Sequence, residues 1–297
     1  MSARAEWQLE ARLEPSAPKD PALDYCLWPY ARPVESAPGS MRSSVLLFHS
    51  LWLFGASGHM LAAVDAIRDA AGDFGTVFGV KIADGRVSWE FYFYDYNRWE
   101  RRFGIGHIAN ALADKLDWTA PTDDTKPYFM FSIEFDDRHA KGLLPLDRVD
   151  VYVGTPDTGT SAGICFGLDD TGYELRNLYY FYNARTQFDA ACAKAFATVR
   201  FDGRHTDQGT LFWPEMQGVE TLVVANKRRS DGVYFSRIRL AQLVLFLERA
   251  GFPREIADFI DQNYAELDHH LFDVGYDYEM RPGGRLQITK GSFYGLL

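Results

Sequence analysis

The sequence is poor in cysteine and has no long apolar run. Its three cysteines, Cys26, Cys165 and Cys192, form no CxxC pair and leave one thiol unmatched. This pattern disfavours a structural zinc site and favours a protein of a reducing compartment. Each cysteine is expected to be a small buried hydrophobic residue. The longest apolar stretch, residues 45–54, is interrupted by His49 and Ser50 and is far too short to cross a bilayer. The charged first residues contain no apolar segment of the secretory type. We therefore expect a cytoplasmic protein that does not insert into a membrane.

Several catalytic motifs are also missing. The chain has no GxSxG elbow, no phosphate-binding P-loop and no Rossmann glycine run, which removes the main support for a hydrolase, a nucleoside triphosphatase or a dehydrogenase. It has no DDxxD box for a metal-bound diphosphate, and the histidine pair 269–270 lies outside any HExxH context. No metal site is predicted and no cofactor is expected to be required, with Mg²⁺ as an option. The net charge of −10 disfavours binding to nucleic acid.

Aromatic residues, in contrast, are abundant: the chain has 22 Phe, 16 Tyr and 7 Trp, which is 15% of its length and more ring surface than a core requires. They sort by strand parity. In residues 87–96, one face of the expected strand carries Val87, Trp89, Phe91 and Phe93, and the other carries Ser88, Glu90, Tyr92, Tyr94 and Tyr96. The same alternation recurs in residues 129–136 and 148–153. Each strand therefore has an apolar face and a polar face rich in tyrosine.

Turn residues and helical spacing divide the chain into repeated units of two strands and a helix. Asp84-Gly85 between alternating segments is a strong hairpin signal, and about five hairpins are expected, at 76–96, 129–153, 163–183, 219–238 and 271–294. Helices are expected at 57–71, 104–117, 186–197 and, in one or two pieces, 240–267. Residues 1–42, rich in Pro, Ala and Ser, form an irregular N-terminal arm, which leaves 43–297 as a single domain.

These units predict an α/β (α+β) fold, a closed antiparallel barrel of about ten strands with helices outside and a polar aromatic lumen. Antiparallel hairpins bury their aliphatic face beneath helices, and closure removes the edges of the sheet. The alternative is an open sheet whose polar face meets solvent. The mixture of Tyr with Glu, Ser, Arg and Lys favours an enclosed binding chamber, because amphipathic rings combine apolar surface with a hydrogen-bonding tip.

Three short segments point to a family. Trp89-Glu90-Phe91 resembles a hydrophobic-acid-Phe strand in the first hairpin of the aromatic prenyltransferases with the α-β-β-α barrel. Tyr234-Phe235-Ser236 resembles a strand of that family whose tyrosine binds diphosphate, and Lys290-Gly291-Ser292-Phe293-Tyr294 is similar to the final strand, where Lys and Tyr face the lumen. The resemblance covers residues 57–297. It implies transfer of an isoprenoid, dimethylallyl or geranyl, from its diphosphate to an indole, phenol or peptide side chain, a reaction type of secondary metabolism.

The resemblance and the strand parity together select candidate residues. A diphosphate needs cations and hydroxyl donors, for which we expect Lys81, Arg148, Tyr152, Tyr182, Lys227, Tyr234, Lys290 and Tyr294. The carbocation needs ring faces and exclusion of water, and the acceptor needs contacts, for which we expect Tyr92, Tyr94, Tyr180 and Ser236. Glu90 is expected to orient the acceptor or remove its proton.

Plainer interpretations of the same residues stay open. Glu90 is as well explained as a hydrogen-bonded structural carboxylate, and Lys227, beside a turn, as a solvated lysine. A non-catalytic barrel for a small hydrophobic ligand needs the tyrosine wall but not the cations. A glycosidase could use Glu90 and Glu134 as its two carboxylates.

Overall fold

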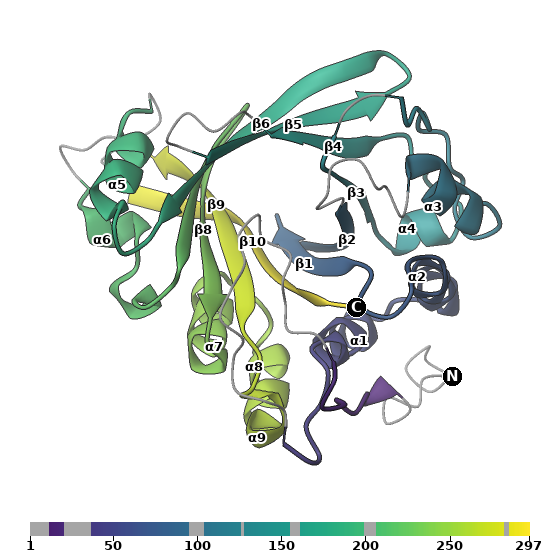
Figure 1. Cartoon of the computed structure of the whole chain (residues 1–297), viewed down its shortest axis with the longest axis horizontal. Coiled ribbons are helices and arrows are strands. Elements are labelled where there is room, and N and C mark those ends of the chain that lie inside the picture. Colours follow the sequence, from purple (N-terminus) through teal and green to yellow (C-terminus); the bar gives the residue numbers. More distant parts are fainter. Residues whose placement is uncertain are drawn as a thin grey trace.

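The computed structural model describes residues 12–20, 37–94, 104–125, 128–154, 161–198, 206–281 and 285–297. Within them, ten antiparallel strands form a closed barrel in which each strand pairs with its neighbours along the chain and the last pairs with the first (Figure 1). The strands are β1 (Val77–Ala83), β2 (Arg86–Tyr94), β3 (Met130–Phe135), β4 (Val149–Gly154), β5 (Ser161–Asp169), β6 (Gly172–Asn183), β7 (Thr221–Lys227), β8 (Asp231–Ile238), β9 (Phe272–Arg281) and β10 (Arg285–Leu296). The predicted closed antiparallel barrel is confirmed.

Helices lie around the outside of the barrel, as predicted (Figure 1). They are α1 (Ser44–Leu53), α2 (Gly58–Ala71), α3 (Ile105–Ala111), α4 (Asp137–Ala140), α5 (Phe188–Phe196), α6 (Gln208–Leu211), the 3₁₀ helix η3 (Pro214–Met216), α7 (Leu240–Arg249), α8 (Arg254–Gln262) and α9 (Tyr264–Leu267). The helix expected at 104–117 ends earlier, at Ala111. In the described part of the chain no helix is long and apolar enough to cross a membrane.

Local sequence explains the first hairpin and the helix before it. Asp84 and Gly85 join β1 to β2 with φ angles of 50° and 72°, the left-handed pair that a tight two-residue hairpin turn requires. The Ser57 hydroxyl accepts a hydrogen bond from the Met60 amide and caps α2. Residues 282–284, within the last predicted hairpin, and Tyr96, predicted on the polar face of its strand, lie outside the described residues.

The apolar strand faces pack against the helices and form the main core. On β2, Trp89, Phe91 and Phe93 are at most 2% exposed. The apolar run at 45–54, to which the sequence analysis assigned no structure, is helix α1, and its residues from Ser44 to Leu51 are buried. The Trp89 indole donates to the Ser50 hydroxyl at 2.9 Å. Ser50, one of the two polar residues that interrupt the apolar run, therefore provides the hydrogen-bond acceptor for the buried Trp89 N–H.

The described parts of the N-terminal arm are held on α2 by ion pairs. Arg12 contacts Asp65 at 2.8 Å, and Glu14 binds Arg68 through both carboxylate oxygens. Cys165 and Cys192 are buried free thiols, as expected, and Cys26 lies outside the described residues.

Candidate functional site

The inward side chains of the barrel line a cavity of about 520 Å³. Eleven of the thirteen residues selected from the sequence lie in its wall: Lys81, Glu90, Tyr92, Tyr94, Arg148, Tyr152, Lys227, Tyr234, Ser236, Lys290 and Tyr294. The period-two alternation predicted these positions because successive residues of a strand face opposite sides of the sheet. The chain as a whole carries a charge of −10, yet the described wall has seven Lys and Arg against five Asp and Glu.

The other two predicted residues, Tyr180 and Tyr182, face outward, so their assignment to the lumen is wrong. Lys194 of α5 lies 4.0 Å from the centre of the Tyr180 ring, and Tyr182 is buried in the outer core. Tyr179 and Phe181 line the cavity instead. The register between β5 and β6 shifts at Arg176. Cys165 pairs with Asn177 and Phe166 pairs with Leu175, so Arg176 is an extra residue of β6 that has no pairing partner on β5. This bulge reverses the parity of the strand, and the run of four aromatic residues that follows gives no alternation from which to detect it.

Five tyrosines form a belt around the cavity, one from each even-numbered strand: Tyr92, Tyr152, Tyr179, Tyr234 and Tyr294. Consecutive ring centres lie 5.7 Å apart from Tyr294 to Tyr92, then 6.3, 6.2 and 6.0 Å apart from Tyr92 through Tyr152 and Tyr179 to Tyr234. Burial raises the pKa of all five hydroxyls. We call this set the tyrosine belt. It presents ring faces and protonated hydroxyl donors to whatever occupies the cavity.

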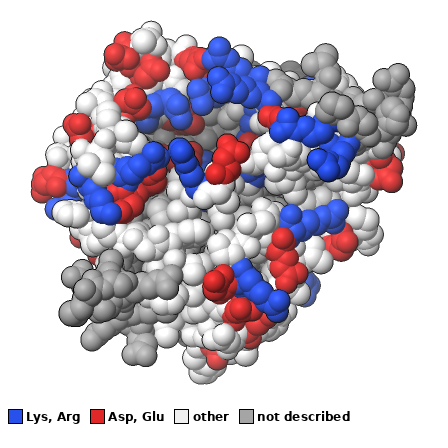
Figure 2. All heavy atoms as spheres, turned by 180° about the vertical axis from the view of Figure 1, so that it is seen from behind, with Lys and Arg blue, Asp and Glu red and all other residues white. Residues whose placement is uncertain are grey.

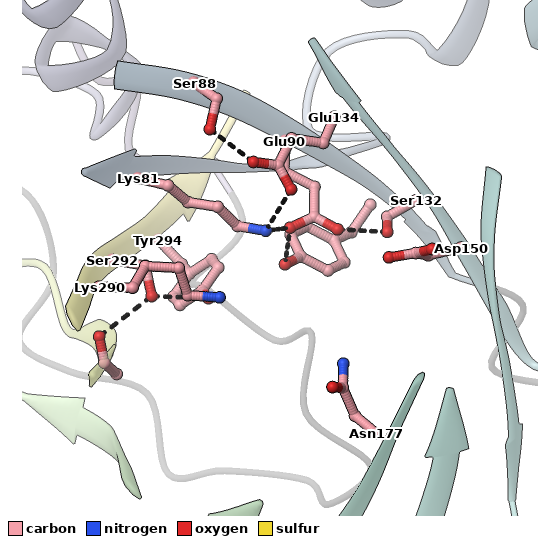
Figure 3. A network of polar contacts seen from close by, with 12 residues as sticks. Lys81, Ser88, Glu90, Ser132, Glu134, Asp150, Asn177, Lys290, Ser292 and Tyr294 are labelled. Atoms are coloured by element: carbon pink, nitrogen blue, oxygen red, sulfur yellow. Dashed lines mark hydrogen bonds and ion pairs between the residues drawn. The ribbon is translucent and has the colours of Figure 1, made fainter. Parts of the chain in front are cut away.

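Lys81 of β1 binds two glutamates from the next two strands, β2 and β3, and these three residues are here named the acidic pole. Its ammonium contacts Glu90 of β2 and lies 3.0 Å from Glu134 of β3. The hydroxyls of Tyr92 and Ser132 also donate to Glu90. Figure 3 shows the hydrogen bond from Ser132. All of these donors favour the ionised form of the carboxylate.

The pKa values of Glu134 and Lys81 in this pole are both lowered. Burial would raise the pKa of Glu134, but the charges of Lys81 and Lys290 and a 2.5 Å hydrogen bond from Ser88 lower it to about 2. Burial lowers the pKa of Lys81, with Glu134 opposing. Glu134 is therefore a carboxylate throughout the ordinary pH range.

Further along the same wall, two lysines share one aspartate, and Lys227, Asp277 and Lys290 are here named the basic pole. The Lys227 ammonium lies 2.6 and 2.8 Å from the two oxygens of Asp277 and donates to the Tyr234 hydroxyl at 2.8 Å. Lys290 reaches Asp277 at 3.1 Å. Lys227 is thus a buried, paired cation rather than the solvated lysine of the alternative interpretation.

The shared aspartate gives the two lysines different proton affinities. Burial would raise the pKa of Asp277, but Lys227 and Lys290 lower it. Burial, reinforced by the charge of Lys290, lowers the pKa of Lys227 to about 8 although Asp277 opposes. For Lys290 the attraction of Asp277 outweighs burial and raises the pKa. Lys227 is consequently the cation of this pole that titrates nearest to neutral pH.

Asp277 was missed in the sequence, although the pattern of β9 contains it. Phe272, Val274, Tyr276 and Tyr278 are fully buried on the outer face, so Asp273 and Asp277 between them face the lumen. Asp273 accepts hydrogen bonds from the Ser236 hydroxyl at 2.9 Å and from the Arg237 amide at 2.7 Å. The Ser236 hydroxyl therefore donates to a carboxylate beside the cavity.

Arginines line the cavity at the barrel end that carries the hairpin turns. Arg148, Arg176, Arg228 and Arg229 come from the start of β4, from β6 and from the β7–β8 turn. Arg148 lies 3.3 Å from Asp150, and Arg176 and Arg228 both contact Glu174. On one face of the molecule, Lys and Arg side chains gather around a hollow with Asp and Glu among them (Figure 2). Arg148 thus lies in the wall as predicted, but immediately before β4, which the barrel order places opposite the β9 strand of the basic pole.

In the described ranges no group of three or more His, Cys, Asp or Glu side chains is placed to hold a metal ion. No protein-family model matches this sequence, and no curated protein matches it significantly.

Proposed function

We propose that this protein transfers an isoprenoid from an allylic diphosphate to an electron-rich aromatic acceptor inside the barrel. The tyrosine belt carries the proposal. A chain of five protonated tyrosines shares the wall with two charged clusters, which together provide cations for an anion and aromatic faces for a carbocation. The resemblance of the three sequence segments adds support, since their lumen residues Glu90, Tyr234 and Lys290 all lie in the cavity wall.

The diphosphate is assigned to the basic pole. Lys227 and Lys290 present ammonium groups, and Tyr234 and Tyr294 present hydroxyl donors, next to one another in the wall. When the allylic C–O bond breaks, its electron pair goes to the diphosphate oxygen. Fixed cations in the cavity wall stabilise the developing negative charge, because they are already oriented towards it before the bond breaks.

The carbocation and the acceptor are assigned to the belt and the acidic pole. Tyrosine ring faces attract a cation through their quadrupoles. Glu90, kept ionised by its three donors, accepts a hydrogen bond from an indole N–H or a phenol O–H and so orients the acceptor. The acceptor ring then supplies the electron pair of the new C–C bond. A ring proton must leave afterwards to restore aromaticity.

The two alternatives make different demands on the same wall. A neutral-ligand barrel needs no cations, yet Lys227 and Lys290 are buried there at the cost of desolvation. A glycosidase needs one protonated carboxylic acid, whereas Glu134 has a pKa of about 2 and shares Lys81 with Glu90. Neither alternative explains the pairing of the charges as well as prenyl transfer does.

The test is direct assay of purified protein with dimethylallyl and geranyl diphosphate against indoles, phenols and peptides containing Trp or Tyr, with Mg²⁺ and with EDTA. We expect a product heavier by one prenyl group and an equal amount of released diphosphate. Lys290→Ala should weaken binding of a non-reactive thiolodiphosphate analogue, and Arg148→Ala, a change opposite the basic pole, should weaken it less. Arg254→Ala is the matched control, because its side chain is 83% exposed on α8. Absence of both turnover and analogue binding in the wild type would overturn the proposal.

A further inference from the structure

Asp150 differs from the other four described carboxylates in the cavity wall. Those four each accept from cations or hydrogen-bond donors: Glu90 from Lys81, Tyr92 and Ser132, Glu134 from Lys81 and Ser88, Asp273 from Ser236 and the Arg237 amide, and Asp277 from Lys227 and Lys290. Such partners hold a carboxylate in its ionised form and make it a weak proton acceptor.

The surroundings of Asp150 are poorer in donors. Its side chain is 19% exposed, and its buried Oδ1 accepts no hydrogen bond from any described residue; Arg148 Nε approaches this atom at 3.3 Å. The charged groups that face it are Arg148 immediately before β4, Lys81 on β1, Glu134 on β3 and Arg176 on β6. Burial raises the pKa of Asp150 and Glu134 adds to the rise, while the three cations oppose it.

Asp150 also lies beside the acceptor-orienting group of the proposed function. Strand pairing places Asp150 of β4 opposite Ser132 of β3, and the Ser132 hydroxyl donates to Glu90 of β2. In Figure 3 the Asp150 carboxylate points from β4 into the barrel towards this cluster. On β4, Tyr152 of the tyrosine belt follows on the same face. An aromatic acceptor bound to Glu90 therefore has Asp150 along the same row of inward side chains.

We propose that Asp150 is the catalytic base that removes the ring proton of the acceptor, an inference that rests on the proposed function. The allylic C–O bond breaks with its electron pair leaving on diphosphate, and an electron pair of the ring forms the new C–C bond. The Asp150 carboxylate then takes the proton from the substituted ring carbon, and the C–H electron pair returns to the ring. The neutral acid afterwards releases its proton to solvent. Atoms and charge balance without a further reactant.

The division of roles follows from the donor count. Glu90, whose three donors leave one lone-pair site for the acceptor, orients the acceptor, and Asp150, with few donors, accepts the proton. A base whose pKa lies closer to the working pH transfers protons more effectively than a strongly stabilised carboxylate. The rate should consequently rise with pH as Asp150 ionises, which gives the pH profile an acidic limb.

The experiment uses Asp150→Asn, Asp150→Glu and the control Asp169→Asn, whose carboxylate lies at the β5–β6 turn outside the cavity wall. Asp150→Asn should lower kcat at least about a hundredfold, the usual size of a general-base contribution. It should leave thiolodiphosphate affinity unchanged and remove the acidic limb. With an acceptor deuterated at the reacting carbon, Asp150→Asn should show a primary isotope effect on kcat that the wild type lacks, because proton removal becomes the slow step in the variant. Asp150→Glu should keep the acidic limb and part of the rate.

The outcomes separate this inference from the proposal beneath it. Turnover by the wild type together with an unchanged rate or acidic limb in Asp150→Asn overturns the role of Asp150 alone. Loss of rate without a change in isotope effect or limb also overturns it, because a purely structural role would produce that pattern. A wild type that neither binds the analogue nor turns over overturns the proposed function, and this inference with it.

Discussion

At the acidic pole one lysine, Lys81, faces two glutamates, whereas at the basic pole two lysines share Asp277. Each cluster compensates all but one of its charges, so the residual charge is negative at one pole and positive at the other. Burying an unpaired charge costs several kcal/mol, and each cluster lowers that cost by internal pairing. The barrel can therefore hold six ionisable side chains in its wall and still offer an anion and a hydrogen-bond donor two distinct places to bind.

The poles come from different parts of the chain, β1–β3 against β7, β9 and β10, and they meet because β10 pairs with β1. Closure is thus what makes the site. Lys81 and Lys290 are near enough for each to affect the charge balance at Glu134. We expect the poles to be electrostatically coupled but separable by mutation, and three changes test how far the comparison holds.

The largest effect should come from neutralising the basic pole with Lys227→Met, Lys290→Met and Asp277→Asn together. Two charge-assisted hydrogen bonds to the diphosphate are lost, each worth about 1.5–3 kcal/mol, so affinity for the thiolodiphosphate analogue should fall roughly 10²- to 10⁴-fold. Calorimetric titration measures this. The corresponding change at the acidic pole, Lys81→Met with Glu90→Gln and Glu134→Gln, should leave analogue affinity much less affected. Equal losses at both poles would contradict the assignment of the anion to one of them.

Stability provides the control for this experiment. The double variant Lys227→Met, Lys290→Met leaves Asp277 buried without a partner and should lose about 3–5 kcal/mol in denaturant unfolding. The triple variant removes the stranded charge as well and should recover most of that loss. Weak binding in a triple variant that unfolds like the wild type therefore reports on the site rather than on folding.

A smaller effect should appear in the pH dependence of binding. Lys227 has a pKa of about 8, so above pH 8 it loses its charge and analogue affinity should fall, by up to about tenfold per pH unit for one linked proton. For folding the sign is opposite: between about pH 8 and 10.5 the unfolded chain binds this proton more tightly, so Lys227 makes the protein more stable as pH rises. In Lys227→Arg the guanidinium stays charged, and the alkaline fall in affinity should disappear. An unchanged fall in that variant would assign the titration to another group.

Strand alternation was sufficient to predict most of the fold. Helices were placed by 3.6-residue spacing and hairpins by turn pairs such as Asp84-Gly85, and closure followed from the cost of leaving a tyrosine-rich face in water. Helix α1 was not predicted, because its residues are apolar on all sides and therefore show no periodicity; only burial between the barrel and α8 explains them.

The site was predicted less completely, for two physical reasons. Interaction partners are set by barrel closure, so Lys227 was as compatible with solvent as with Asp277 until β7 and β9 were placed in one wall. The alternation of inward and outward side chains along a strand is reversed beyond a bulge, and the bulge at Arg176 has no sequence marker such as glycine. The sequence also did not predict that the Tyr234 ring packs directly on the backbone of Gly275. A Cβ added at Gly275 would lie 2.0 Å from this ring, so only glycine leaves room for this tyrosine of the belt.

The smallest expected effect comes from removing one tyrosine hydroxyl, on the inner face of the barrel in one variant and on the outer face in another. Tyr234→Phe removes the acceptor of the 2.8 Å hydrogen bond from Lys227 and a donor to the diphosphate, and a neutral hydrogen bond is worth about 0.5–1.5 kcal/mol. Analogue affinity should fall about two- to tenfold. Tyr182→Phe makes the same chemical change on the outer face and should leave affinity unchanged, since the ring lies in the helix-packed core. If Tyr182→Phe weakened binding as much as Tyr234→Phe, the parity of β6 after its bulge would be wrong. Tyr182 would then return to the lumen where the sequence had placed it.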